Sequence, residues 1–173
     1  QAQGQAKQAI NNFEKALGID PAHQPTLDAM VAVYESLKDY KQVCNYKRQI
    51  LDNVVDGQQR FKMLCDIGDI WVDKENNLPK GVEAFEEALD LEPQNHVLLH
   101  KLLQLYGKTS NWEKMVDCLQ RIADLENNPE RKSRYLFTMA QVYRDADKLN
   151  DALRAVDLFN EALDLNPGYL EAF

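Results

Sequence analysis

The sequence predicts an all-α fold made of repeated pairs of helices, and three observations support this prediction. One phrase recurs three times, as AINNFEKALGIDP, GVEAFEEALDLEP and AVDLFNEALDLNP. In the segments between these phrases, apolar residues recur at i, i+3, i+4 and i+7, which places them on one face of a helix. Each phrase also ends in proline, which cannot continue a helix. Self-similarity at a fixed spacing is typical of repeat architectures, in which each unit buries its apolar face against its neighbours.

The first kind of helix carries one apolar stripe. In PTLDAMVAVYESL the stripe consists of Leu27, Met30, Val31 and Tyr34. The same stripe returns in three later segments, as Leu64, Ile67, Gly68 and Trp71, as Leu99, Leu102, Leu103 and Tyr106, and as Leu136, Met139, Ala140 and Tyr143. Four helices are therefore expected to share one buried pattern.

The second kind of helix places a large residue between two small ones. Ala9, Phe13 and Ala16 lie on one helical face, so that a neighbouring backbone can approach closely while the ring fills the gap. The same pattern returns as Gly81, Phe85 and Ala88 and as Ala155, Phe159 and Ala162, and the closing prolines are Pro21, Pro93 and Pro167. The predicted unit is helix, tight turn, helix, proline.

This combination of stripes and prolines resembles the tetratricopeptide repeat, which has about 34 residues per unit. The resemblance covers essentially the whole chain and implies an all-α, right-handed α-solenoid of helix-turn-helix repeats. Residues 1–173 then form a single array. Its expected parts are the second helix of a partial repeat at 1–21, complete repeats at 22–56, 57–93, 94–128 and 129–167, and the start of a further helix at 168–173.

The sequence also has a period longer than the single repeat. Phe13 and Phe85 are 72 residues apart, so repeats alternate between two kinds. In the second kind, Val43, Lys47 and Ile50, or Met115, Leu119 and Ile122, occupy the Ala, Phe and Ala positions. Lys47 is the weakest match to the pattern, and Tyr46 beside it is expected to fill the space of the missing ring.

The connections depart from the family pattern at four places. NVVDGQQ around Gly57 and ENNPER around Pro129 predict longer links between repeats, whereas DKENNLPKG and DADKLNDAL predict longer turns inside the second and fourth complete repeats. Insertions of this kind map to loops on one side of a solenoid. They are either contact points for a partner or tolerated surface loops.

The two ends predict an open array. Residues 1–18 supply only one helix of a repeat, and Phe173 in GYLEAF falls at the position that Leu27 and Leu99 hold after their prolines. Terminal repeats normally carry a polar outer face for solubility, and neither end has that pattern. We expect either a fragment of a longer array or an array whose ends meet another chain, which includes self-association by end-to-end stacking.

Composition narrows the classes of partner. The net charge of −8 opposes nucleic acid and anionic membrane surfaces, which attract clustered Lys and Arg. No apolar run approaches the roughly 20 residues of a membrane-spanning helix. Cys44, Cys65 and Cys118 form neither an even set nor a CxxC pair, so reduced thiols are expected and a cytoplasmic location is favoured. No cofactor is predicted.

The resemblance also implies where a partner would bind. In the family, first helices line a concave groove and their non-core face contacts the ligand. Carried over by repeat position, the groove residues are Asp28, Glu35, Lys62, Asp69, Asp73, His100, Gln104, Lys108, Arg134, Phe137, Gln141 and Arg144. The first half is acidic and the second basic, which suits a peptide or helix of mixed charge. The alternative is a solvated helix face without a ligand.

Chemical sites have little support in the sequence. His96 and His100 are spaced i, i+4 as metal ligands can be, yet no further His or Cys completes a zinc site. Cys65 and His100 occupy equivalent positions on adjacent first helices, but no orienting group or oxyanion site accompanies them. Asp66, Asp69 and Asp73 form an acidic ladder that either receives a basic partner or keeps the helix soluble.

Three functional hypotheses remain. The main one is a non-enzymatic scaffold that binds a peptide or helix of another protein in its groove, with Phe137 as an exposed aromatic hot spot. The second is a structural module that stacks through its terminal repeats. The third is the interaction arm of a larger enzyme. An enzyme within this segment is disfavoured because it has no Gly-rich phosphate loop, catalytic triad or complete metal constellation.

Overall fold

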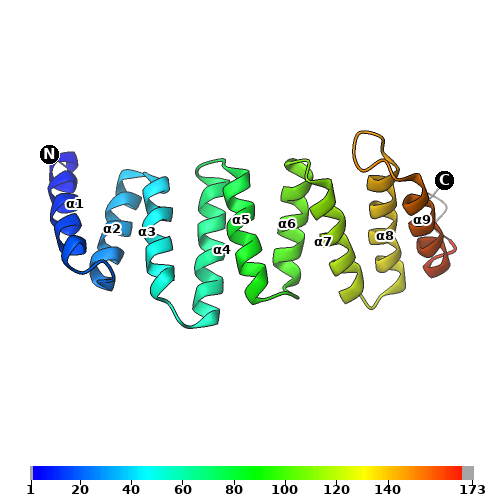
Figure 1. The fold of residues 1–173 in the computed structure, drawn as a ribbon, viewed down its shortest axis with the longest axis horizontal. Coiled ribbons are helices and arrows are strands. Elements are labelled where there is room, and N and C mark those ends of the chain that lie inside the picture. The colour runs from blue at the N-terminus through cyan, green and yellow to red at the C-terminus, as the bar shows by residue number, and fades with distance from the viewer. Residues whose placement is uncertain (1, 169–173) are drawn as a thin grey trace. The chain divides into compact units, whose positions relative to one another are not determined.

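The computed structural model describes residues 2–168, and over these residues all the regular secondary structure is helical, with no strand (Figure 1). The helices of this described part are α1 (Ala2–Ile19), α2 (Gln24–Leu37), α3 (Tyr40–Asn53), α4 (Gly57–Asp73), α5 (Leu78–Leu91), α6 (His96–Lys108), α7 (Trp112–Leu125), α8 (Pro129–Arg144) and α9 (Ala152–Leu165). The predicted all-α class is therefore confirmed. The further helix expected at the end of the chain lies outside the described residues.

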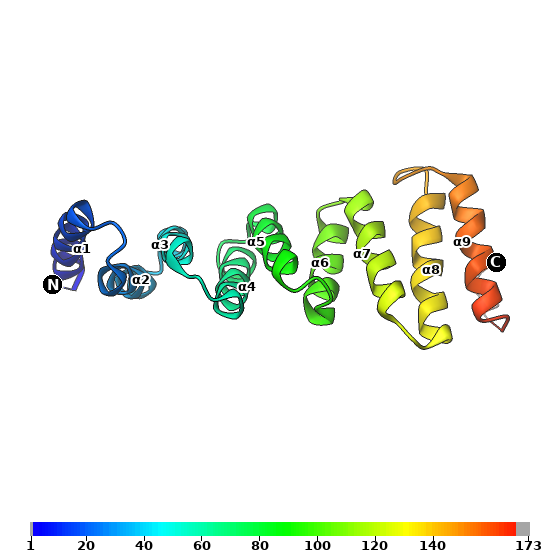
Figure 2. The ribbon, with the colours of Figure 1, turned by 60° about the horizontal axis from the view of Figure 1, so that its bottom comes forward.

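The chain divides into two compact units, Gln1–Glu92 and Pro93–Phe173. In the first unit α1 packs on α2, α2 on α3, α3 on α4, and α4 on α5. In the second unit α6 packs on α7, α7 on α8, and α8 on α9. Each helix thus contacts its neighbours in sequence, as Figure 2 shows within each unit. This is the packing expected of helical repeats.

Local chemistry explains where the helices begin and end. Helices α1, α5 and α9 each end two residues before the proline of the recurring phrase. At seven helix starts an Asp or Asn side chain accepts a hydrogen bond from the backbone N–H three residues later, which satisfies one of the unpaired donors of the first turn. The capping residues are Asp39, Asp56, Asn77, Asn95, Asn111, Asn128 and Asp151.

The predicted long turns are present, but the predicted long links are not. Residues 74–77 join α4 to α5 and residues 145–151 join α8 to α9, against only 38–39 between α2 and α3. The links at 54–56 and 126–128 are as short as the other links between repeats. The prediction of longer links was wrong because α4 begins at Gly57 and α8 at Pro129, so the additional residues extend these helices.

Each unit is held by side chains of both helix types. In the first unit Phe85 is fully buried beside Gly68, and Gly81 lies against Val72. In the second unit a buried cluster joins three helices through Leu119, Leu136, Met139, Ala140, Leu158 and Ala162. The stripes read from the sequence are therefore the packed faces of the helices.

Candidate functional site

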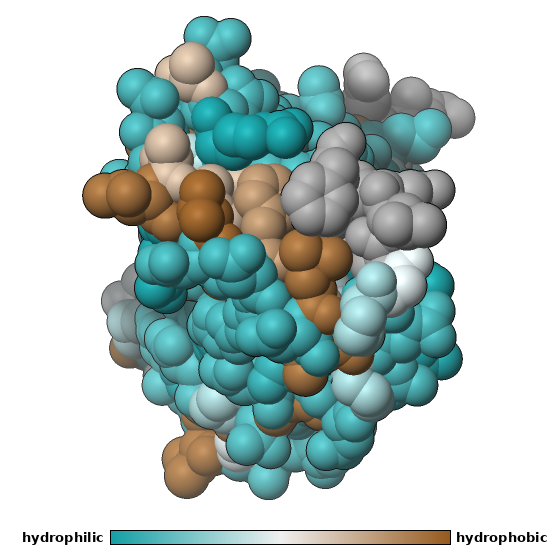
Figure 3. Space-filling model, turned by 90° about the vertical axis from the view of Figure 1, so that its right-hand side faces the viewer, coloured by the Kyte–Doolittle hydropathy of each residue, from teal (hydrophilic) through white to brown (hydrophobic). Residues whose placement is uncertain are grey.

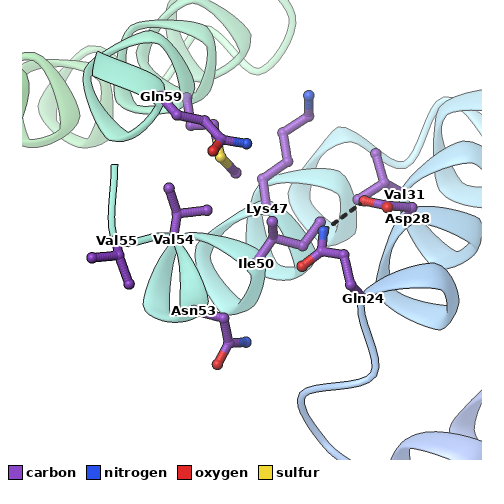
Figure 4. Close-up of a pocket in the computed structure, with 10 residues that line it drawn as sticks. Gln24, Asp28, Val31, Lys47, Ile50, Asn53, Val54, Val55 and Gln59 are labelled. Atoms are coloured by element: carbon purple, nitrogen blue, oxygen red, sulfur yellow. Dashed lines mark hydrogen bonds between the residues drawn. The ribbon is translucent and has the colours of Figure 1, made fainter. Parts of the chain in front are cut away.

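An open cleft of about 590 Å³ lies between α2, α3 and α4 in the first unit (Figure 4). Its volume is in the range of protein ligand sites, roughly 300–1,000 Å³. Helix α2 faces it with its first two turns, α3 with its last two turns, and α4 with its first two turns. The lining residues are Gln24, Asp28, Val31, Lys47, Ile50, Asn53, Val54, Val55, Gln59 and Met63.

The end of α3 shapes the apolar part of the cleft. Val54 is the C-cap of α3 in an extended conformation (φ −84°, ψ 119°), so the chain leaves the helix axis there. The next residue, Val55, is 96% exposed. From α4, the Arg60 guanidinium donates hydrogen bonds to the carbonyl oxygens of Leu51 at 2.6 Å and Val54 at 3.0 Å. These bonds fix the segment that presents both valines.

The polar part of the cleft comes mainly from α2. The Gln24 amide donates a hydrogen bond to the Asp28 carboxylate at 3.0 Å, along the same helix face. In Figure 4 these two side chains lie opposite Ile50, and Gln59 reaches toward the cleft from α4. Amide groups can pair with the backbone of an extended peptide, and the carboxylate can accept from a basic side chain.

Lys47 joins the helices around the cleft. Its ammonium lies 2.5 Å from Asp66 of α4 and 4.0 Å from Glu35 of α2. Its side chain is 19% exposed, and its stem lines the cleft. The consensus ring is thus replaced by a charge that bridges two first helices. Tyr46, beside Lys47, is stacked on Tyr34 with 5.6 Å between ring centroids.

The predicted groove residues of the first unit are placed as follows. Asp28 lines the cleft. Glu35 does not line it but forms an ion pair with the lining residue Lys47. Lys62 and Asp73 are exposed on α4, and Asp69 is half-buried on the same helix. Asp66 of the acidic ladder is already paired with Lys47, so that ladder is partly neutralised within the chain.

In the second unit, most predicted groove residues are exposed. They are His100, Gln104 and Lys108 on α6 and Arg134, Gln141 and Arg144 on α8. Phe137 is half-buried, and its ring packs edge to face on Phe159 of α9 at 5.2 Å. Arg144 lies 5.7 Å from the same Phe159 ring. Phe137 is therefore a rim residue of the α8–α9 packing rather than a freely projecting side chain.

His100 is engaged on both ring nitrogens. Its Nδ1 lies 2.8 Å from the His96 carbonyl oxygen and its Nε2 lies 3.2 Å from the Tyr135 hydroxyl. The carbonyl can only accept, so in the neutral imidazole Nδ1 carries the proton and the Tyr135 hydroxyl donates to Nε2. Among the described residues, no group of three or more His, Cys, Asp or Glu side chains could hold a metal ion.

The two buried thiols, Cys44 and Cys118, have the properties of unreactive cysteines. Cys44 and Cys118 are 1% and 4% exposed. Burial, with smaller effects of nearby charges, raises the pKa of each thiol from 9.0 to about 11. Cys65 is half-buried on α4. Within residues 2–168, no helix is both long enough and apolar enough to cross a membrane.

A smaller cleft of about 420 Å³ lies in the second unit, where the α6–α7 turn meets the long α8–α9 turn. Lys148 from the long turn lies 5.2 Å from the Trp112 ring centroid and forms an ion pair with Asp145 at 2.9 Å. The lengthened turn thus packs on the neighbouring turn.

Of the groove residues predicted from the sequence, Asp28 alone lines the cleft. The apolar lining residues Ile50, Val54, Val55 and Met63 were not selected, although NVVDGQQ was noted as unusual. The available signal was a pair of valines directly before a helix N-cap. Its meaning depends on the ends of two helices, which the sequence pattern locates only approximately.

Comparison with known proteins agrees with the repeat pattern. Residues 1–23 match the family model for the tetratricopeptide repeat. No curated protein matches the sequence. The chain is similar in structure to YrrB, a TPR protein with an unusual peptide-binding site, at 14% identity and a TM-score of 0.46, covering 98% of this chain and 82% of that one.

Two further solved structures are similar over comparable lengths. One is the MamA protein, at 16% identity and a TM-score of 0.48, covering 98% of this chain and 87% of that one. The other is TTC0263, a thermophilic TPR protein in Thermus thermophilus, at 16% identity and a TM-score of 0.41, covering 99% and 88%. Identities at this level transfer no ligand to the present chain.

Proposed function

Because this chain is built of repeats of the tetratricopeptide type, we propose that it is a non-enzymatic scaffold that binds a peptide segment of another protein. Such repeats present helix faces to protein partners, and fold alone does not name the ligand. The observation that carries the proposal is the cleft between α2, α3 and α4. It combines a cavity of about 590 Å³ with apolar, amide and carboxylate groups.

The lining chemistry supports one kind of peptide as the partner. Val54, Val55 and Met63 offer an apolar surface for one large side chain of the peptide. Asp28 offers a carboxylate for a Lys or Arg, while Gln24 and Gln59 supply amide groups for its backbone. An extended segment with an apolar and a basic residue a few positions apart fits this arrangement. The exposed charges of α4 then steer the peptide toward the cleft.

The exposed residues of the second unit extend the proposal. Arg134 and Arg144 on α8 supply positive charge, and Gln104 on α6 supplies an amide. By itself, this face of the second unit would fit an acidic segment of a partner. Electrostatic complementarity of this kind sets register and association rate more than affinity.

Selection from a displayed library of random peptides, followed by titration of an enriched peptide, tests the proposal. We expect Asp28→Lys and Val55→Asp to weaken binding about tenfold or more, because each removes a direct contact and adds repulsion or a desolvation cost. Both residues are exposed, so folding is preserved. The matched controls are Asp90→Lys on α5 and Val97→Asp on α6, both exposed and outside the cleft. Equal binding by all four variants would refute the cleft assignment.

A further inference from the structure

Lys47 links the α2–α3–α4 cleft to a cluster of charged side chains beside it. The stem of Lys47 lines the cleft, whereas Glu35 and Asp66 do not. The Lys47 ammonium lies 2.5 Å from the Asp66 carboxylate and 4.0 Å from the Glu35 carboxylate. We call Glu35, Lys47 and Asp66 the charged cluster. Lys47 thus belongs both to the cleft and to the charged cluster.

Helical spacing places the charged cluster in line with the cleft. On α2, Asp28 lines the cleft and Glu35 follows seven residues later, which is close to two full helical turns and therefore on the same face. On α4, Gln59 lines the cleft and Asp66 follows at the same spacing. Since each helical residue rises about 1.5 Å, the cluster lies about 10 Å further along both helices.

The cleft therefore has an apolar end and a charged end. Val54 and Val55 follow the last residue of α3, whereas Lys47 lies about two turns earlier in that helix. Asp28 lies opposite Ile50, which stands between Lys47 and Val54 along α3 (Figure 4). A bound chain that runs along the cleft would meet the valines, then Asp28, then the charged cluster.

Lys47 sets the charge at that end. Its ammonium places one positive charge between the two negative charges of Glu35 and Asp66. The Lys47 side chain is 19% exposed, so water screens its charge less than that of a fully exposed lysine. Asp28 differs, because it accepts a hydrogen bond from the neutral amide of Gln24 and keeps its negative charge available to a partner.

We propose that Lys47 is the specificity-determining residue that limits the cleft to peptides with one basic side chain, a proposal that rests on the peptide-binding function proposed above. An extended chain advances about 3.3 Å per residue. A peptide that places a basic side chain on Asp28 therefore reaches the charged cluster with the residue three positions away. The Lys47 ammonium already occupies the place between Glu35 and Asp66, and it repels a second basic side chain there.

Charge, rather than apolar contact, is what makes such a cleft selective. Apolar side chains are exposed elsewhere in the chain, and Leu153 and Val156 of α9 are 83% and 55% exposed. Figure 3 looks onto the α9 end of the second unit and shows hydrophobic patches beside hydrophilic ones. Because exposed apolar surface is not confined to the cleft, discrimination between partners there rests on which charges are accepted and which are repelled.

Two capped fluorescent peptides test the proposal, Leu-Ala-Lys-Ala-Ala-Ala and Leu-Ala-Lys-Ala-Ala-Lys. Each is titrated with the 173-residue chain and followed by anisotropy. The leucine suits the apolar end of the cleft, the first lysine suits Asp28, and the second lysine of the dibasic peptide reaches the charged cluster. The same two peptides in reversed order cover the opposite chain direction.

The readout is the ratio of the dissociation constants of the monobasic and dibasic peptides. With the unchanged chain, we expect the second lysine to alter the dissociation constant less than about twofold, because it meets the Lys47 ammonium. With Lys47→Met, the dibasic peptide should bind about fivefold more tightly than the monobasic one, because the Glu35 and Asp66 carboxylates can then pair with it. Adding Glu35→Gln to Lys47→Met should remove part of this gain.

Two variants serve as controls for the change in charge. Lys41→Met removes the same charge from the same helix, but Lys41 is 71% exposed and does not line the cleft. The ratio should stay at the value of the unchanged chain in Lys41→Met. Lys47→Arg should also keep that ratio, because it retains the positive charge between the two carboxylates.

Three results would overturn the proposal. The first is the same ratio in Lys47→Met and in the unchanged chain, since a purely structural role of Lys47 would weaken both peptides equally. The second is an equal change of the ratio in Lys41→Met, which would show an effect of overall charge alone. The third is no saturable binding of either peptide to Lys47→Met up to about 1 mM. The proposed function fails by a different result, namely when Asp28→Lys and Val55→Asp bind the monobasic peptide as well as the unchanged chain does.

Discussion

Gly68 and Phe85 are packed so closely that a side chain at position 68 would force the Phe85 ring to move. A Cβ built on Gly68 would lie 2.7 Å from two atoms of the Phe85 ring and closer still to a third, Cε1. Real Cβ atoms essentially never approach a heavy atom so closely, and Phe85 is fully buried. The backbone of α4 thus lies directly on the ring that α5 supplies.

The substitution Gly68→Ala should therefore destabilise the protein. Alanine favours helix over glycine by about 1 kcal/mol, but overpacking of a core costs typically about 1–3 kcal/mol. We expect a net loss in the free energy of unfolding of up to about 2 kcal/mol, measured by urea denaturation. Gly107→Ala is the control, since its nearest side-chain atom lies at 3.9 Å. That variant should be neutral or slightly stabilising.

Replacing the ring should relieve the clash. In the double variant Gly68→Ala, Phe85→Leu, the smaller side chain leaves room for the new methyl group. The loss in the double variant should be smaller than the sum of the two single losses by about 1 kcal/mol. Strict additivity in this cycle would mean that the two residues do not constrain each other.

Arg60 should stabilise the C-terminal end of α3. Its guanidinium binds two terminal carbonyl oxygens, those of Leu51 and Val54. We expect Arg60→Ala to cost about 1.5–3 kcal/mol, since a hydrogen bond from a charged group contributes about that much. Arg60→Lys should recover only part of this stability, because the lysine ammonium lacks the planar fork of the guanidinium. Hydrogen exchange at residues 51–55 measures the effect, and unchanged protection there would contradict it.

The three cysteines should differ in reactivity. Cys44 and Cys118 are buried, and the pKa of each thiol is raised to about 11. The thiolate is the reactive form, so both should react slowly with a disulfide reagent at about pH 8. Cys65 is half-buried and should react first. Mass spectrometry of the partly labelled protein identifies the site, and early labelling of Cys44 or Cys118 would contradict the prediction.

The same shifts predict a loss of stability at alkaline pH. The folded-state pKa values of Cys44 and Cys118, about 11, exceed the ordinary value of 9.0. As pH rises, the unfolded chain therefore releases the two thiol protons before the folded protein does. The contribution of the two thiols to the free energy of unfolding is fully present below about pH 9 and is lost as pH rises toward about 11. A Cys44→Val, Cys118→Val variant should lose less stability between about pH 8 and about pH 10.5. The comparison uses urea unfolding of both proteins at each pH.

The periodicity of the apolar residues was sufficient to predict the helices, because each helix buries one apolar face and this burial sets the spacing. The stripe containing Gly68 and the triplet containing Phe85 were both recognisable, and their contact follows from small residues permitting close approach. The lengths of the links were misread because Gly57 and Pro129 are loop-forming residues that here begin helices. Pro at the first helical turn is favourable, which explains the second case.

The candidate site was less predictable than the fold. Asp28 could be found because it occupies a repeated position on a first helix. Val54 and Val55 could not, because their exposure depends on the conformation at the end of α3 and on the two bonds from Arg60. Lys47 could be recognised as a departure from the pattern, but its partners Glu35 and Asp66 lie on two other helices.

Site-specific photo-cross-linking is the most direct test of the central claim that the α2–α3–α4 cleft receives a peptide. A benzophenone side chain at position 55 would stand at the cleft, and the same group at position 97 would stand on α6. With a peptide selected on the unmodified chain, the account predicts cross-linking from position 55 that excess unlabelled peptide suppresses, and none from position 97. Equal cross-linking from both positions, or cross-linking from position 97 alone, would contradict it.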